Sequence, residues 1–259
     1  STIRNRMTKL NGGTPISDGP FRNGSMYLTY TNEGMPIGAF WGYKTDGLIQ
    51  TQEQLNAVKR ADFQPNAELG DVLFVDTNGD GKLDSSDRCM IGNPIPDIIY
   101  GINMGMAWKG FDLNLQFGGT IGNQIFNAMR YYTYFPNDIT NKDRALMNYW
   151  TPNNTNTDIP RLTATDVNDN DRFSDMYVEN GTYFRLRNAQ LGYTLPASLT
   201  QRIKLQKVRF YVSGQNLFTI SSYSGMDPEV GQSSSLSRGI DYGIYPQNIS
   251  FTGGINVTF

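Results

Sequence analysis

The sequence has 259 residues, a formal net charge of -2 and a pI near 5.2. It contains no basic run or stripe, so nucleic acid is not an expected partner. It has no histidine, which excludes triads and zinc sites that depend on imidazole, and its single cysteine, Cys89, cannot form an internal disulfide. The mean hydropathy of -0.45, without an apolar run of helix-spanning length, excludes a transmembrane helix but allows membrane-spanning strands, in which only alternate residues are apolar. No signal peptide opens the sequence, so we expect a mature form or an excised piece.

Residues 1–97 begin with one short predicted strand at 1–10 and then become dense in Gly, Pro, Asn and Asp. This composition predicts a long loop region, and its aromatic content argues against disorder. Inside it, a short helix is predicted from Thr51 to Arg60, because Thr51 can cap the helix and Gln54 follows three residues later. We therefore expect folded loops.

The stretch from Asp76 to Asp87 matches the start of the calcium-binding pattern D-x-[DN]-x-[DN]-G and has Asp where an EF-hand ends in Glu. A hard cation needs several oxygen ligands on a short arc. The predicted ligands are side-chain oxygens and one backbone carbonyl, that of Lys82; the full set is Asp76, Asn78, Asp80, Lys82, Asp84 and Asp87. The alternative is a turn whose Asn and Asp side chains bond to its own backbone without metal. Calcium is the predicted cofactor.

Two long strands joined by a tight turn follow, at 98–108 and 111–118. Apolar residues such as Ile102, Met104 and Met106 alternate with small or polar ones over about ten positions, the length and pattern of a membrane-spanning strand. A water-soluble sheet can alternate in the same way. The length of the strands and the long polar loops favour the membrane.

A second insertion occupies residues 121–181. It contains two predicted short helices, at 123–132 and 141–149, and then a stretch at 153–175 that is rich in Asn, Asp and Thr. The latter composition predicts a solvated loop.

Three further strands are predicted downstream, at 183–195, 208–217 and 249–259. In the first, the apolar positions change parity partway along, as a β-bulge produces. The connections between the five strands alternate in length, since 109–110 and 196–207 are short whereas 119–181 and 221–243 are long. Outer-membrane barrels have this asymmetry, with short periplasmic turns and long extracellular loops.

Short motifs are spread over nearly the whole chain. They are Gly34-x-Pro36-x-Gly38-x-Phe40-x-Gly42-Tyr43; Gly70-Asp71-Val-x-Phe74-x-Asp76-x-Asn78-Gly79-Asp80-Gly81-x-x-Asp84; Asp87-Arg88-x-x-Ile91-Gly92-x-Pro94-x-Pro96; Tyr100-Gly101; Phe111-Asp112-Leu113; Trp150-Thr151 with Pro160-Arg161; Tyr183-Phe184-Arg185-Leu186-Arg187-Asn188; and Ser213-Gly214-Gln215-Asn216-Leu217-Phe218. Together they resemble the C-terminal part of the SusC/RagA-type TonB-dependent outer-membrane transporters of Bacteroidetes.

The resemblance implies a barrel of about 22 strands in the bacterial outer membrane. It also implies an N-terminal plug that contacts TonB, a SusD-like surface lipoprotein as a lid, and a glycan or peptide substrate; the plug and most of the barrel are missing from this sequence. The resulting prediction for residues 1–259 is all-β: the C-terminal strands of a large antiparallel transmembrane β-barrel with long extracellular loops, in contact with membrane lipid. The predicted function is TonB-dependent nutrient import.

Aromatic residues of the long loops are predicted to contact the substrate or the partner: Trp41, Tyr43, Tyr131, Tyr132, Tyr134 and Trp150. The alternative for each is packing within the loops. Three arginines, Arg185, Arg187 and Arg209, are predicted to line the barrel lumen, where they can also pair with carboxylates. Membrane-interface positions are predicted for Tyr100, Trp108 and Phe259.

The sequence offers no pair of carboxylates in an apolar setting, so no enzyme is predicted. One alternative function belongs to a different class: a secreted calcium-binding β-sandwich that binds carbohydrate through its loop aromatics. The solubility of the intact protein separates the two hypotheses, because a sandwich stays monomeric without detergent.

Overall fold

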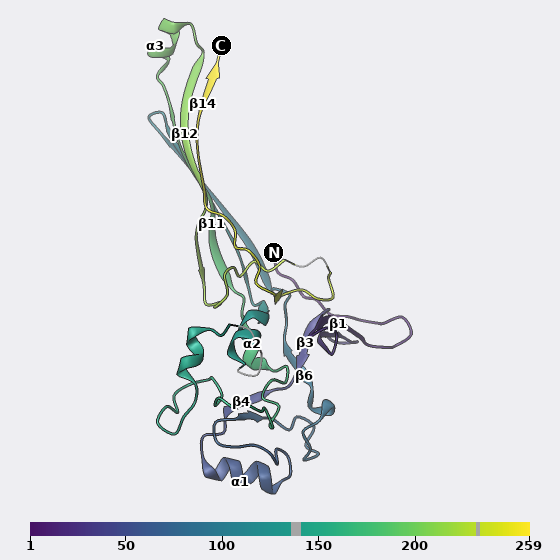
Figure 1. Cartoon of the computed structure of the whole chain (residues 1–259). Coiled ribbons are helices and arrows are strands. Elements are labelled where there is room, and N and C mark those ends of the chain that lie inside the picture. The colour runs from purple at the N-terminus through teal and green to yellow at the C-terminus, as the bar shows by residue number, and fades with distance from the viewer. Residues whose placement is uncertain (136–140, 232–233) are drawn as a thin grey trace.

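Five long antiparallel strands form one sheet in the structure, a computed structural model that describes residues 1–135, 141–231 and 234–259. In sheet order they are β14 (Ser250–Thr258), β12 (Lys207–Ser221), β11 (Tyr183–Thr194), β8 (Phe111–Ile121) and β7 (Ile98–Trp108). Figure 1 shows this sheet as a narrow stalk, with the C-terminus and α3 (Ala197–Thr200) at one end and the folded long connections at the other. The sheet is open, and β7 and β14 are its two edges.

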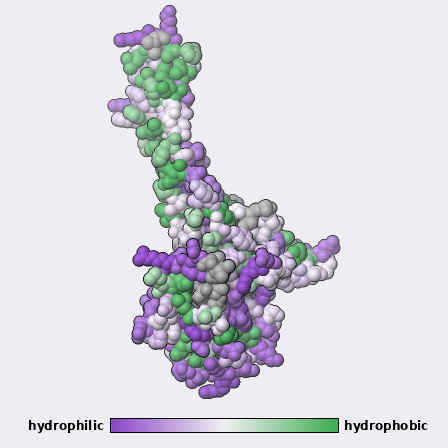
Figure 2. Space-filling model, viewed as in Figure 1, coloured by the Kyte–Doolittle hydropathy of each residue, from purple (hydrophilic) through white to green (hydrophobic). Residues whose placement is uncertain are grey.

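The register of the five strands gives the sheet one apolar and one polar face. One row across the sheet holds apolar or small residues, namely Met104, Leu115, Ala189, Gly214 and Phe251, and the next row holds Gly105, Asn114, Gln190, Ser213 and Thr252. Neighbouring rows point to opposite faces because side chains alternate along a strand. The apolar face is exposed, with Met106 at 68% and Phe251 at 79% of full accessibility, and Figure 2 shows its hydrophobic residues along the stalk.

All three clusters of buried apolar side chains that the described residues form lie outside this sheet. A β-sandwich buries such a face against a second sheet. The sandwich hypothesis is therefore wrong for these strands, and the arrangement is that of a barrel wall, as predicted from the alternation.

The short connections lie at the α3 end. Between β7 and β8, Lys109 (φ 46°) and Gly110 (φ 88°) both adopt the left-handed conformation that a two-residue hairpin turn requires. Between β11 and β12, α3 leads into the 3-10 helix η4 (Gln201–Ile203). The predicted parity change is confirmed as a β-bulge, because the pairing of β11 shifts between Leu186 and Asn188.

The remaining elements lie in the long connections. One sheet contains β1 (Ile16–Phe21), β2 (Met26–Thr31), β3 (Ala39–Gly42) and β6 (Cys89–Gly92); another contains β10 (Val178–Asn180), β9 (Gln124–Asn127) and β13 (Ile240–Asp241); β4 (Thr45–Leu48) pairs with β5 (Val72–Phe74). The helices are α1 (Gln52–Arg60), α2 (Ala128–Tyr134) and the 3-10 turns η1 (Ser85–Asp87), η2 (Arg144–Asn148) and η3 (Asp175–Tyr177). Among the described residues, no helix has the length and apolar character needed to cross a membrane.

The long connections share one hydrophobic core. Phe21, Leu28 and Phe40 come from the segment before β7, Phe126, Tyr131, Phe173 and Tyr177 from the segment between β8 and β11, and Ile240 from the segment between β12 and β14. The parallel pairing of β13 with β9 joins the last two segments directly. We call the described residues of 1–97, 122–182 and 222–249 the loop domain. The prediction of folded loops is confirmed, although residues 1–97 contain a sheet that was not predicted.

Local predictions in the loop domain were right for α1 and only partly right elsewhere. Thr51 and Gln54 form the expected capping box at the start of α1. In contrast, residues 1–10 make only an isolated bridge between Thr2 and Ile98, and no strand. A stable strand needs a continuous ladder of partners, whereas this segment bonds with Asp97 and Ile99 around Thr2 and then with a different segment, residues 34–35, at Met7.

The second insertion also differs from its prediction. The helix expected at 123–132 begins only at Ala128, because the four residues before it pair with β10 and β13 as β9. The helix expected at 141–149 is the shorter 3-10 turn η2. The stretch at 153–175 is not simply a solvated loop, since Phe173 is buried in the shared core. Long-range pairing and packing, which local composition does not encode, decided each case.

Candidate functional site

Arg185 is buried on the polar face of the sheet, at 2% accessibility, beneath the connection between β12 and β14. It donates to Asp227 Oδ1 at 2.6 Å, to Glu229 Oε2 at 2.8 Å and to Thr219 Oγ1 at 2.8 Å. Burial acts to raise the pKa of Asp227, but the backbone N–H groups of Gln247 and Glu229 and the Arg185 guanidinium outweigh it, so the pKa lies below its ordinary value. Arg185 thereby ties this connection to the barrel wall.

Arg187 and Arg209 also pair with carboxylates on the polar face. Arg187 Nη2 donates to Glu229 Oε1 at 3.1 Å. Arg209 Nε donates to Asp112 Oδ1 at 2.9 Å, and the guanidinium crosses over Gly192, where an added Cβ would lie 2.4 Å from Arg209 Nη2. The alternative of pairing with carboxylates thus describes all three arginines, and their exposure to a lumen stays a prediction.

Two of the predicted contact aromatics are core residues. Tyr131 is 3% and Trp150 6% accessible, and the indole N–H of Trp150 donates to Gln50 Oε1 at 2.8 Å. Trp150 therefore packs within the loop domain, as the alternative describes, and its contact with a substrate or partner stays a prediction. Tyr131 keeps one polar end near the surface, where its hydroxyl reaches Arg22.

The other predicted contact aromatics are partly exposed. Trp41 stacks on Tyr30 with ring centroids 4.7 Å apart. Tyr43, Tyr132 and Tyr134 are half-buried. Burial raises the pKa of Tyr134, although the charge of Arg130 acts to lower it. Tyr132 and Tyr134 share α2 with Tyr131, whereas Trp41 belongs to β3 and Tyr43 follows it, so the structure does not bring all six aromatics into one site.

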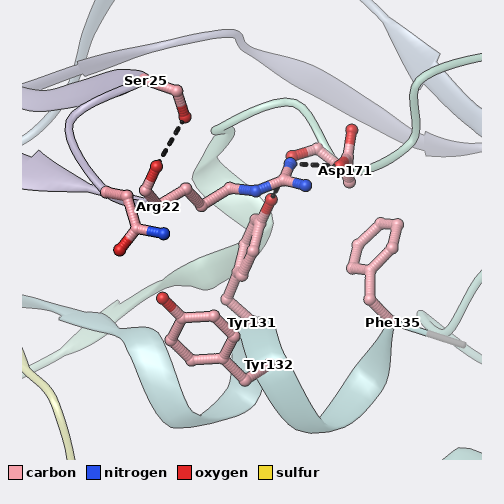
Figure 3. Close-up of a pocket in the computed structure, with 7 residues that line it drawn as sticks. Arg22, Ser25, Tyr131, Tyr132, Phe135 and Asp171 are labelled. Carbon is pink, nitrogen blue, oxygen red and sulfur yellow. Dashed lines mark hydrogen bonds and ion pairs between the residues drawn. The ribbon is translucent and has the colours of Figure 1, made fainter. Parts of the chain in front are cut away.

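A cavity with a volume of about 510 Å³ lies between the β1–β2 turn and α2. Its lining is Arg22, Asn23, Ser25, Tyr131, Tyr132, Phe135 and Asp171. Figure 3 shows the Arg22 side chain running across the top of Tyr131 to Asp171, with the rings of Tyr132 and Phe135 on either side. Burial, and then the Asp171 charge, raise the pKa of Tyr131 despite the nearby guanidinium. Of this group, sequence analysis had singled out only the two tyrosines.

The acidic loop is held by its own hydrogen bonds. Asp76 accepts from the N–H groups of Gly79 and Gly81, which hold its pKa below the ordinary value although burial opposes this, and the buried Asp87 accepts from Thr77 and Asp84. Asn78, Asp80 and Asp84 each accept from a backbone N–H two residues on.

This is the geometry of the metal-free alternative, in which each side chain closes a turn. No group of three or more Asp, Glu or Cys among the described residues is arranged to hold a metal ion. The geometry therefore adds no support for calcium at the six predicted ligands, and the cation stays a prediction.

Buried contacts that sequence analysis missed connect two of the motifs. Gly70 (φ 85°) lies against the indole of Trp150, where an added Cβ would be 2.2 Å from Cε3. Next to it, the fully buried Asp71 accepts from Arg161 Nε at 2.7 Å and from Asn170 Nδ2 at 3.0 Å. A buried carboxylate needs such partners to offset its lost hydration. These motif residues hold the loop domain together.

Comparisons with known proteins cover the whole chain. TonB-dependent receptor P3 of Formosa agariphila is 37% identical over 271 residues, which cover 100% of this chain and 26% of that protein. TonB-dependent receptor SusC of Bacteroides thetaiotaomicron is 29% identical over 198 residues, covering 76% of this chain and 18% of SusC. The RagAB peptide importer in its open-open state superposes with a TM-score of 0.70 at 25% identity, covering 98% of this chain and 25% of that one. No family model matches the sequence.

The chain spans about a quarter of the length of the P3 receptor. Its relatives are named as receptors and transporters, and none of those names describes an enzyme. The open sheet corresponds to part of their barrels, and these proteins lie in the outer membrane of Gram-negative bacteria. The chain belongs to the SusC/RagA-type TonB-dependent outer-membrane transporters, as a part of their β-barrel with its loops.

Proposed function

We propose that the complete transporter imports an oligosaccharide or a peptide across the outer membrane in a TonB-dependent manner. The observation that carries the proposal is the likeness to TonB-dependent receptors along the whole chain. In this proposal the polar face of the five-stranded sheet lines the lumen, where Arg185, Arg187 and Arg209 lie. The apolar face contacts lipid.

The proposed partners are a SusD-like surface lipoprotein, which covers the loop domain, and TonB, which acts through a plug outside these residues. One solved relative is named as the RagAB peptide importer. The surfaces proposed to meet the lipoprotein or the substrate are residues 21–70 and 121–180. Long loops that fold around a core of their own present a fixed surface, and binding residues are commonly carried on such loops.

Uptake in the native bacterium tests the proposal. A strain lacking the gene is complemented with the full-length transporter, with versions shortened in the proposed surfaces, and with Lys109→Asn as a control that preserves the left-handed turn. The intact protein and the control are expected to restore growth on the transported nutrient and to co-purify the lipoprotein, and the shortened versions are not.

Removal of TonB is expected to abolish uptake even when the transporter is intact. Growth and co-purification that persist without the proposed surfaces would refute their role. Uptake that does not depend on TonB would refute the transport mechanism itself.

A further inference from the structure

We infer that the α3 end of the five-stranded sheet holds one anionic phospholipid, with its headgroup on Arg202 and Lys204 and an acyl chain in a hollow of the apolar face. The hollow has a volume of about 410 Å³. The inference rests on the assignment of the apolar face to lipid and does not depend on which nutrient is transported. The short connections lie at this end, and outer-membrane barrels place such connections at the periplasm, so the lipid belongs to the periplasmic leaflet.

The connection between β11 and β12 carries positive charge without a nearby acidic residue in the sequence. Residues 195–210 contain no Asp or Glu. Arg202 and Lys204 are exposed, and among the described residues neither forms an ion pair. A phosphate group accepts two parallel hydrogen bonds from a guanidinium, and an ammonium adds a compact charge beside it. A phosphodiester with one negative charge therefore complements this pair.

The other charged side chains at this end have contacts or directions of their own. Asp112 accepts a hydrogen bond from Arg209 on the polar face, and Lys207 belongs to a row of the same face. The Nζ of Lys109 lies 4.9 Å from the centre of the Trp108 ring, where its charge interacts with the indole. The two basic residues of the connection are therefore left for a ligand.

The connection between β11 and β12 folds onto the apolar face of the sheet. Val208 belongs to a row of that face and pairs with Val257, yet Val208 is 6% accessible whereas Val257 is 42% accessible. Contact between α3 and β12 accounts for this burial. Figure 2 shows hydrophilic side chains at the tip of the stalk directly next to hydrophobic ones. The basic residues therefore lie where lipid headgroups border the hydrocarbon.

The hollow is a place on the apolar face where side chains are small. Its floor includes Ala189, Gly214 and Gly253, and taller apolar side chains such as Val212 stand beside them. An added Cβ at Gly253 would meet the carbonyl oxygen of Tyr211 at 3.9 Å and nothing closer, so the space above this glycine is open. Side chains that line a void lack dispersion contacts, which a flexible hydrocarbon chain supplies.

The hollow lies at the depth of the periplasmic leaflet. Val212 follows Lys207, the first residue of β12, by five positions. Five residues of a strand span about 17 Å, and because barrel strands tilt by about 35–45°, the depth in the membrane is about 13 Å. One leaflet contributes about half of the 30 Å hydrocarbon core. An acyl chain whose headgroup lies on the connection therefore reaches the hollow.

Native mass spectrometry of the full-length transporter in detergent tests the inference. The probes are dioleoyl phosphatidylglycerol, which is anionic, and dioleoyl phosphatidylethanolamine, which is zwitterionic and has the same acyl chains. The unaltered protein is expected to bind phosphatidylglycerol more tightly and to retain one such lipid after others have dissociated. TonB, the lipoprotein and the nutrient are all left out, so a failure of the proposed import leaves this result unaffected.

A double variant, Arg202→Gln with Lys204→Asn, tests the headgroup contacts. Asparagine is chosen because residue 204 has a φ of 56°, which asparagine tolerates. At roughly fivefold per basic residue, the affinity for phosphatidylglycerol is expected to fall about 25-fold, with that for phosphatidylethanolamine unchanged. A folding defect would instead lower the binding of both lipids.

A second variant tests the acyl chain. Gly253→Phe fills the hollow and is expected to abolish the retention of one lipid, whichever headgroup it carries. The matched control is Ile102→Phe, which adds a ring to the apolar face outside the hollow and is expected to retain the lipid.

Three results would overturn the inference. The first is equal affinity of the unaltered protein for the two lipids, and the second is a preference for phosphatidylglycerol that survives in the double variant. The third is that Gly253→Phe retains the lipid as well as Ile102→Phe does, which would show that no acyl chain occupies the hollow.

Discussion

Replacing Gly70 with Ala is expected to loosen the loop domain far more than the same change at Gly47. Both glycines have positive φ, 85° and 73°, so each substitution costs about 1–2 kcal/mol in backbone strain. Around Gly47 a Cβ meets nothing within 4 Å, whereas at Gly70 it would lie 2.2 Å from Cε3 and 2.6 Å from Cδ2 of Trp150. Forcing an extra carbon into such packing costs roughly 1–3 kcal/mol more. The total for Gly70→Ala is therefore about 2–5 kcal/mol.

Hydrogen exchange followed by mass spectrometry on the full-length transporter measures this difference. Each 1.4 kcal/mol corresponds to about a tenfold change in the local opening equilibrium. Peptides that contain Trp150, Asp71 or Arg161 are expected to exchange roughly five- to a hundredfold faster in Gly70→Ala than in Gly47→Ala, with the barrel strands unchanged. Equal effects of the two substitutions would show that strain alone matters at Gly70 and that the contact with the indole does not.

Four further predictions concern the acidic loop, the topology, Asp227 and the isolated chain. Titration calorimetry is expected to detect one Ca²⁺ bound by the acidic loop and lost in Asp80→Ala, and the absence of calcium-dependent heat in the unaltered protein would refute the cofactor. A cysteine that replaces Ser85 should react with an impermeant label on intact cells, and one that replaces Lys109 should react only after permeabilisation. The reverse pattern would show that the acidic loop lies on the periplasmic side. The pKa of Asp227 in the folded protein lies below its ordinary 3.8, so its contribution to stability is complete above pH 3.8 and is lost as the pH falls through the folded-state pKa. Hydrogen exchange in the connection between β12 and β14, corrected for intrinsic rates, should therefore accelerate only below about pH 4. The chain by itself should aggregate, since the open sheet edges leave backbone groups unpaired in lipid at several kcal/mol each; a monodisperse, heat-modifiable species would contradict this.

The barrel strands could be predicted because their information is local. Alternation along each strand marks its two faces, and the turn at Lys109 and Gly110 uses a residue type suited to a left-handed position. The core of the loop domain could not be predicted in this way. Phe21 packs edge-on against Phe126 and Tyr131, with centroids 5.4 and 5.0 Å away, although more than a hundred residues separate them in the chain.

The candidate sites show the same division. Tyr131 and Tyr132 were predicted because aromatic residues stand out in a polar loop, but Arg22 and Asp171 are 149 positions apart and have no local signal. Trp150 carries the same aromatic signal as a binding residue, and its packing is revealed by contacts distant in the chain, with Gly70 and Gln50. The acidic loop is ambiguous for a chemical reason, because the oxygens that could bind calcium are the ones that close its turns.

The bulge in β11 links the apolar face of the sheet to the connection between β12 and β14. If Arg187 continued the regular alternation instead of forming a bulge, the strand that places Phe184 and Leu186 on the apolar face would turn Ala189 and Leu191 to the polar one. The insertion keeps the apolar face continuous, and it leaves Arg187 beside Arg185 on the polar side, where the two oxygens of Glu229 each bind one of them. The neighbouring strand β12 is also irregular at the level of the bulge. Asn216 lies there with a φ of 52°, a conformation that asparagine tolerates better than most residues. The register of the barrel wall therefore determines where the connection between β12 and β14 is held, so a change at the bulge would act on the apolar face and on this connection together.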